Sequence, residues 1–374
     1  MADGVSAAPP LRVFLNTLAG DYLLWTLLLA LAMFSLAQPS GIAHYPDLVD
    51  WPTIATLTGL LALTKGVELS GYLPRLARRL VAAIGTERKL AVFLVLATAL
   101  LATVLTNDVA LFVMVPLTLT LKDSGVPLTR LVVFEALAAN AGSVLTPIGN
   151  PQNLFLWQLA GVPFEHFVFA MLPLAAVLMA PLLLLTLVAF SGKQLQLASS
   201  RKPGHADRLM LMLSLGLYIP FLLVTDMRHP YLALVALTPL LLARRTLLAR
   251  LDWALILVFI LMFIDLRLLS QLDLVQAWMK SFDLGHLPHL YLAGIAASQV
   301  ISNVPAAILL AEYSRDWRTI AYAVNVGGFG FMLGSLANII ALRMAPDRRA
   351  WIVFHAYSLP FLLLAGALAW PLLD

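Results

Sequence analysis

Polar residues interrupt an otherwise apolar sequence at four places, residues 106–108, 145–153, 302–305 and 327–338. A helix that is broken there leaves free N–H groups that attract an anion and free carbonyls that can coordinate Na⁺. Such a site needs no cationic side chain. The residues that we expect to bind substrate are Thr106, Asn107, Thr146, Gly149, Asn150, Asn153, Ser302, Asn303, Gly334, Ser335 and Asn338.

Ionisable residues inside apolar segments are costly, and they are therefore candidates for ion coupling. Asp108 is the strongest, because beside Asn107 it could carry a proton or bind Na⁺; the alternative is that it caps the helix that follows. Sodium, near Asn107, Asp108 and Asn303, is the one cofactor that the sequence suggests. The ion-coupling candidates are Asp108, Asp265, Arg267, Glu68 and Lys65.

The other ionisable candidates have alternative structural roles. Lys65 and Glu68 are three residues apart on one helix face, which favours an ion pair within the helix. Asp265 and Arg267 point apart on a helix, so each needs a partner elsewhere, unless Arg267 faces the anion. Glu135 lies near the start of an apolar segment, where we expect it to be solvated.

Two asparagines and three glycines near the breaks also have two interpretations. Asn140 and Asn325 fit a binding site and a hydrogen bond between helices equally well. For Gly327, Gly328 and Gly330 we favour helix packing, because small residues let membrane helices approach closely.

The composition restricts the elements that could position these residues. Of the 374 residues, 61% are hydrophobic and only 12% are charged, and the mean hydropathy is +0.90. This excludes a soluble enzyme and a nucleic-acid-binding protein. The chain is instead expected to lie in a lipid bilayer, which is then one of its partners. Because the chain has no cysteine, disulfides, thiolate chemistry and cysteine metal sites are excluded as well.

The hydropathy pattern predicts an all-α polytopic membrane protein with about nine full spans. Two further apolar stretches, 90–121 and 288–313, are each interrupted in the middle, and we interpret them as re-entrant hairpins. The spans are expected near residues 21–38, 52–70, 131–157, 166–190, 208–225, 230–243, 252–270, 318–342 and 351–372.

The basic residues predict an orientation. Most Lys and Arg fall in loops on one side of the predicted topology, and that side should be cytoplasmic. The N-terminus is then in the cytoplasm and the C-terminus outside. Because residues 1–20 lack the pattern of a signal peptide, none is expected.

The two halves of the sequence correspond to each other. At one constant separation, Asn140, Gly142, Gly149 and Asn153 are matched by Asn325, Gly327, Gly334 and Asn338. The equivalent spans are the second and seventh, and the third and eighth, so they lie five spans apart. Because successive spans run in opposite directions, an odd separation makes the two repeats inverted across the membrane. Each repeat then holds one hairpin and one broken span. The predicted parts are 1–190 for the first repeat, 191–207 for a cytoplasmic linker, and 208–374 for a linking span plus the second repeat.

Three motifs resemble the ion transporter superfamily. They are Thr-Asn-Asp-Val-Ala-Leu at 106–111, Leu-Thr-Pro-Ile-Gly-Asn-Pro-Gln-Asn at 145–153 and Ser-Asn-Val-Pro-Ala at 302–306. The sequence is most similar to the arsenite-permease and citrate-transporter-like branch. The divalent-anion branch has paired Ser-Asn-Thr motifs, which this sequence lacks, and this argues against sodium-coupled dicarboxylate transport. The resemblance also implies a homodimer.

The leading hypothesis is a secondary active transporter in the bacterial cytoplasmic membrane. It would carry a small anion or oxyanion, driven by H⁺ or Na⁺, around a midplane site made by two hairpin tips and two broken helices. The alternatives are arsenite efflux, sodium/proton exchange and, from a different class, an anion channel. An enzyme is not expected, because no nucleophile has a histidine at a suitable depth.

Overall fold

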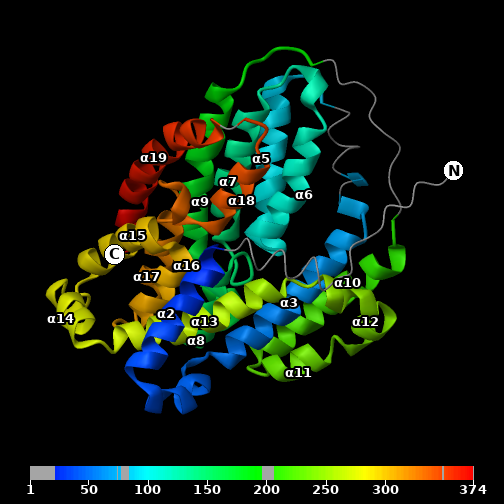
Figure 1. Cartoon of the computed structure of the whole chain (residues 1–374). Helices are drawn as coiled ribbons and strands as arrows, with labels where there is room; N and C mark the ends of the chain where they lie inside the picture. Colours follow the sequence, from blue (N-terminus) through cyan, green and yellow to red (C-terminus); the bar gives the residue numbers. More distant parts are fainter. Residues whose placement is uncertain (1–21, 74, 77–83, 196–205, 348, 374) are drawn as a thin grey trace.

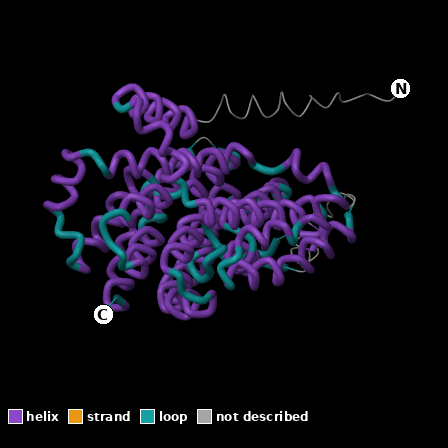
Figure 2. The backbone as a smooth tube through the Cα atoms, turned by 90° about the horizontal axis from the view of Figure 1, so that it is seen from below, coloured by secondary structure: helices purple, strands orange, loops and turns teal. Residues whose placement is uncertain are grey.

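Helices make up nearly all of the structure. The computed structural model describes residues 22–73, 75–76, 84–195, 206–347 and 349–373, and these form helices joined by short loops, with no named strand among them (Figures 1 and 2). The predicted all-α fold is confirmed. The first half contains α2 (Tyr22–Ala37), α3 (Trp51–Leu69), α5 (Glu87–Val104), α6 (Asn107–Leu119), α7 (Leu128–Ser143), α8 (Pro151–Ala160) and α9 (Phe164–Ala189). The second half contains α10 (Arg208–Asp226), α11 (Pro230–Val235), α12 (Thr238–Ala243), α13 (Trp253–Ser270), α14 (Asp273–Ser281), α15 (Leu287–Ile301), α16 (Asn303–Ala311), α17 (Trp317–Val326), α18 (Leu336–Met344) and α19 (Ala350–Ala369).

Several described helices suit a bilayer. By length and composition, α9, α10, α13 and the segment Ala350–Leu372 could each cross a membrane. Their outer faces carry exposed apolar side chains such as Val188, Ile219 and Leu363, which are 84%, 66% and 75% exposed. In water such surfaces would be unfavourable, whereas lipid tails cover them at no cost. The chain is therefore an integral membrane protein.

One predicted span differs in detail from the prediction. The segment 230–243 is interrupted, because α11 ends at Val235 and α12 begins at Thr238. Pro239 accounts for the break: it has no N–H, and its ring would clash with the carbonyl of the residue four positions earlier. The sequence also gave no indication of α14, a short helix in the loop after α13.

The N-terminal ends of α3 and α13 are built in the same way. The carboxylates of Asp50 and Asp252 cap the two helices, each 3.0 Å from a backbone N–H three residues later. The indoles of Trp51 and Trp253 each donate to a carbonyl five residues earlier, at 2.9 and 2.8 Å. The second and seventh predicted spans, 52–70 and 252–270, thus begin alike, as two equivalent spans of a repeat would.

Both predicted hairpins are present as pairs of packed helices, α5 with α6 and α15 with α16. In the first, Leu105 and Thr106 separate the arms, and Thr106 caps α6 by accepting the backbone N–H of Val109 at 3.3 Å. In the second, Ser302 alone separates the arms. Figure 1 shows α5, α6 and α7 side by side, with the red end of the chain, α19, near α9.

Candidate functional site

The first broken helix consists of α7 and α8, separated by residues 144–150. Pro147 and Pro151 supply no backbone N–H and disfavour helix at the residue before them. Asn150 begins α8 by accepting the backbone N–H of Asn153 at 2.9 Å. The predicted break is therefore present, at residues 144–150, and the side-chain oxygen of Asn150 caps the helix that follows; residues 151–153 already belong to α8.

The second broken helix consists of α17 and α18, separated by residues 327–335. This segment contains no proline. Its turn instead depends on glycine, since Gly330 has a φ of 96° that a side chain would make unfavourable. Gly334 closes a short 3₁₀ turn, and Ser335 is buried at the start of α18. The predicted break is present here too, but glycine rather than proline causes it.

The tip of the first hairpin contacts the first break directly. The backbone N–H of Asn107 donates to the carbonyl of Gly149 at 2.9 Å. The hydroxyl of Thr146 donates to the carbonyl of Thr103 at 2.6 Å. In return, the Thr103 hydroxyl donates to the carbonyl of Gly142 at 2.7 Å. These contacts hold Thr106, at the tip, beside the break.

The tip of the second hairpin contacts the second break in a similar way. Gln299, one turn before the tip, donates to the carbonyl of Gly327 at 2.7 Å. Ser302 has a φ of 73°, a conformation that costs a non-glycine residue about 1–3 kcal/mol. The amide nitrogen of Asn303 lies 3.3 Å from the position that a β-carbon on Gly328 would occupy. Each half thus pairs its own hairpin with its own broken helix.

The two broken helices meet through asparagines. Asn140 on α7 donates to Oδ1 of Asn338 on α18 at 2.7 Å. Asn325 on α17 donates to Oδ1 of Asn153 on α8, also at 2.7 Å. Asn140 and Asn338 both reach the carbonyl of Gly328, at 3.3 and 2.9 Å. Asn140 and Asn325 therefore form the expected hydrogen bonds between helices, and their role in binding stays a prediction.

Asn150 joins the same cluster. Its amide donates to Oδ1 of Asn325 at 3.0 Å and to the hydroxyl of Ser143 at 3.0 Å. Asn153 donates to the carbonyl of Val144 at 2.9 Å. We call Asn140, Asn150, Asn153, Asn325 and Asn338 the asparagine cluster; each is at most 4% exposed. The cluster offers both N–H donors and carbonyl acceptors in a buried place and carries no net charge.

Asp108 does not cap α6. Thr106 has that role, and Asp108 lies in the first turn of the helix with its Oδ1 buried and without a hydrogen-bond partner. A buried carboxylate oxygen without a partner is costly unless it is protonated or binds a cation. The alternative role as a cap is therefore not realised, and Oδ1 is available for a proton or a cation.

The charged side chains Lys65 on α3 and Arg267 on α13 bond residues outside the asparagine cluster. Lys65 donates to both carboxylate oxygens of Glu68 at 2.9 Å, the expected pair within one helix. Arg267 donates to Glu312 at 3.0 Å and to the carbonyl of Leu48 at 2.6 Å. Arg267 has thus found partners on other elements. The contribution of these residues to ion coupling stays a prediction.

Two further carboxyl groups are buried. Asp265 is 4% exposed, and neither of its carboxylate oxygens has a hydrogen-bond partner. Glu135 is fully buried and accepts the hydroxyl of Thr118 at 2.6 Å, so our expectation that it is solvated is wrong. The reason is that Glu135 lies in the middle of α7, a helix that packs against α5, α6, α9, α18 and α19.

Three residues that position the breaks were not among our candidates. Thr103 and Gln299 each bond a carbonyl of the adjacent broken helix, and Ser143 accepts from Asn150. A signal existed for the first two, because both are polar, lie in apolar helices and precede a hairpin tip by about one turn. Ser143 ends α7, and only the folded chain places it opposite Asn150.

The fold and the two breaks describe a membrane transporter with a polar centre, and sequence comparison gives the same class. Residues 22–316 match the family described as citrate transporter, and the chain belongs to that family. This confirms the predicted superfamily. The chain is 49% identical over 363 residues to the inner membrane protein YbiR of Escherichia coli, covering 96% of this chain and 97% of YbiR.

More distant relatives are named transporters as well. The chain is 31% identical over 323 residues to the uncharacterized transporter MJ0456 of Methanocaldococcus jannaschii, covering 84% of this chain and 86% of that protein. A putative transporter of Dictyostelium discoideum, arsB, is 24% identical over 135 residues, which is 36% of this chain and 23% of arsB. The protein is therefore a membrane transporter and not an enzyme.

Proposed function

We propose that the protein is a secondary active transporter of a small anion or oxyanion, and that its substrate binds at the asparagine cluster between the two hairpin tips. The observation that carries this proposal is the buried contact of the two broken helices, in which Asn140 bonds Asn338 and Asn325 bonds Asn153. Buried amide groups and the N-terminal ends of α8 and α18 can donate hydrogen bonds to an anion.

Alternating access is the transport mode that this arrangement supports. A channel needs a continuous polar lining, whereas here the side chains of the two halves are bonded to one another and almost fully buried. Substrate must therefore replace contacts within the cluster. If the two halves are inverted across the membrane, exchanging their conformations would expose the same site to the other side.

Asp108 is the proposed coupling residue. Its unpartnered, buried Oδ1 suits a proton, and it suits Na⁺ held together with oxygens near Asn107 and Asn303. In the described part of the chain no group of three His, Asp or Glu residues could hold a metal ion. A sodium ion would thus need amide and backbone oxygens as its other ligands.

The proposal also covers the orientation of the chain in the membrane, its cellular location and its oligomeric state. The basic loops favour a cytoplasmic N-terminus, and the similarity to an Escherichia coli inner membrane protein favours the cytoplasmic membrane. The family resemblance favours a homodimer. Cysteine labelling from each side of spheroplasts would test the orientation, and mass photometry of the detergent-solubilised protein would test the dimer.

Ligand-dependent melting of the purified protein tests the proposed function. The panel contains citrate, succinate, sulfate, phosphate, arsenite and silicate, with and without Na⁺, at pH 6 and pH 8. A ligand that binds only the folded protein raises its melting temperature. An anion-dependent increase that is lost in Asn338→Ala and kept in Gln276→Ala, on α14 and outside the asparagine cluster, would support the site.

Two results would contradict the proposal. If Na⁺ alone raised the melting temperature and no anion did, sodium/proton exchange would replace anion transport. If an anion raised the melting temperature equally in wild type and Asn338→Ala, the substrate would bind elsewhere. A response to arsenite alone would select the arsenite alternative.

A further inference from the structure

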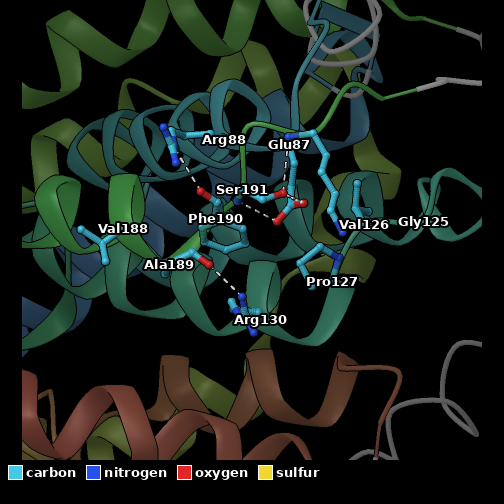
Figure 3. A pocket seen from close by; sticks show the side chains of 11 residues that line it. Glu87, Arg88, Gly125, Val126, Pro127, Arg130, Val188, Ala189, Phe190 and Ser191 are labelled. Carbon is cyan, nitrogen blue, oxygen red and sulfur yellow. Dashed lines mark hydrogen bonds between the residues drawn. The ribbon is translucent and has the colours of Figure 1, made fainter.

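A basic cavity lies away from the asparagine cluster, where α5 and α7 begin and α9 ends (Figure 3). Its volume is about 470 Å³. Three cationic residues line it: Arg88 on α5, Arg130 on α7 and Lys193 after α9. The proposed function makes no use of this cavity.

The charges in the cavity are unbalanced. Glu87 is its one acidic lining residue, and its carboxylate accepts the backbone N–H and the hydroxyl of Ser191 at 3.2 and 2.5 Å. Among the described residues, Arg88, Arg130 and Lys193 form no ion pair with a carboxylate. The cavity therefore presents a net positive charge that a bound anion would neutralise.

Both arginines are held in place by carbonyls at the C-terminal end of α9, those of Ala189 and the capping residue Phe190. Arg88 donates from Nε to Phe190 at 3.0 Å, and Arg130 donates from Nη1 to Ala189 at 2.7 Å. The Arg130 guanidinium also lies 5.8 Å from the centre of the Phe190 ring. Since a guanidinium has five N–H donors, each arginine keeps further donors for a ligand. In Figure 3 these two contacts appear as dashed lines on opposite sides of Phe190.

An apolar cavity adjoins the basic one. Its volume is about 280 Å³, its lining includes Leu128 and Val353, and it shares Val126 and Arg130 with the basic cavity. Val188 lines the basic cavity and is 84% exposed on the outer face of α9, so the cavity opens toward the surface that lipid covers. A cationic space beside an apolar one suits an amphiphile with an anionic head.

We propose that the two cavities together bind an anionic phospholipid. Arg88, Arg130 and Lys193 would hold the phosphate group, and one acyl chain would lie against Leu128 and Val353. Free phosphate shares the head-group chemistry, but it would leave the adjoining apolar cavity unused. The bound lipid would connect α9 to the first arm of the first hairpin and to the start of the first broken helix.

Lipid titration of the purified protein in detergent tests this site. The probes are dioleoyl phosphatidylglycerol, dioleoyl phosphatidylcholine and inorganic phosphate, with melting temperature as the readout. We expect phosphatidylglycerol to raise the melting temperature of wild type more than either other probe. Removing one cation should weaken the apparent affinity about fivefold, which corresponds to about 1 kcal/mol for each basic residue near an anionic lipid surface.

The variants separate binding from folding. Lys193→Gln removes a charge whose side chain makes none of the hydrogen bonds above, and Arg130→Gln removes a charge together with the bond to Ala189. Arg245 is exposed and lines neither cavity, so the variant Arg245→Gln is the matched control and should bind lipid as wild type does.

Equal shifts of the melting temperature with both lipids, or unchanged affinity in Lys193→Gln and Arg130→Gln, would overturn the proposal. An equal shift with inorganic phosphate would assign the site to a free anion instead of a lipid.

Discussion

The amide of Asn140 donates to Asn338 across the contact between the two halves, over 2.7 Å. Asn325 and Asn153, which occupy the equivalent positions in the repeat, form the same bond at the same distance with the halves exchanged. A contact that recurs with its partners exchanged is the pattern that a two-fold axis produces. The centre of the molecule is therefore a symmetric pair of amide contacts.

Removing one of these amides should disrupt both halves. We expect Asn325→Ala and Asn153→Ala each to lower the free energy of unfolding, and the double variant to cost less than the sum of the two. The coupling energy should be about 1 kcal/mol, since hydrogen bonds between membrane helices average about 0.6 kcal/mol and these are fully buried. Reversible denaturation in mixed micelles measures all three variants.

This double-mutant cycle has a control variant and an outcome that would contradict the prediction. Gln276→Ala, on α14, should combine additively with Asn153→Ala, because the two residues share no contact. If Asn325→Ala and Asn153→Ala were also additive, the bond between them would contribute nothing to stability.

Gly142 should tolerate no side chain. A β-carbon there would collide with the backbone carbonyl of Ala99 on α5, and backbone atoms cannot move aside as a flexible side chain can. We expect Gly142→Ala to cost about 1–3 kcal/mol, the usual cost of overpacking. Gly216→Ala on α10 is the matched control, because a β-carbon there meets open space and should stabilise the helix by about 1 kcal/mol. Equal melting temperatures for Gly142→Ala and Gly216→Ala would show that α5 and α7 do not pack closely at Gly142.

The sequence predicts the helical breaks well where their cause is local. Pro147 and Pro151 disrupt helix by their own chemistry, and the positions of Thr106 and Ser302 between two apolar arms mark the hairpin tips. The partners of Asn140 could not be predicted, because they depend on how α7 and α18 pack. Glu135 shows the same limit: its neighbours in sequence suggest an end of a helix in solvent, whereas the helices packed around α7 bury it.

The two ion pairs should differ in their contribution to stability. Lys65 and Glu68 are neighbours on one helix, and such pairs contribute about 0.2–0.5 kcal/mol. Arg267 instead joins α13 to Glu312 and to the carbonyl of Leu48, so Arg267→Met should cost about 1–2 kcal/mol, and Lys65→Met clearly less. Melting temperatures of the two variants in one detergent compare them directly.

Equal losses for Arg267→Met and Lys65→Met would contradict this ranking. If Lys65→Met instead kept its stability but lost gradient-driven transport, Lys65 would have a role in coupling that its pairing with Glu68 does not explain.

Transport in proteoliposomes by wild type and Asp108→Asn tests the central claim most directly. The substrate is the anion that the melting panel selects, and accumulation is measured with and without an imposed gradient of H⁺ or Na⁺. Wild type should concentrate the anion above equilibrium only when one of these gradients is present. Asp108→Asn, which cannot release a proton, should lose this accumulation and keep exchange of internal for external anion. Two results would contradict the account. One is an internal anion concentration in wild type that never exceeds its equilibrium value under either gradient. The other is an Asp108→Asn variant that accumulates the anion as wild type does.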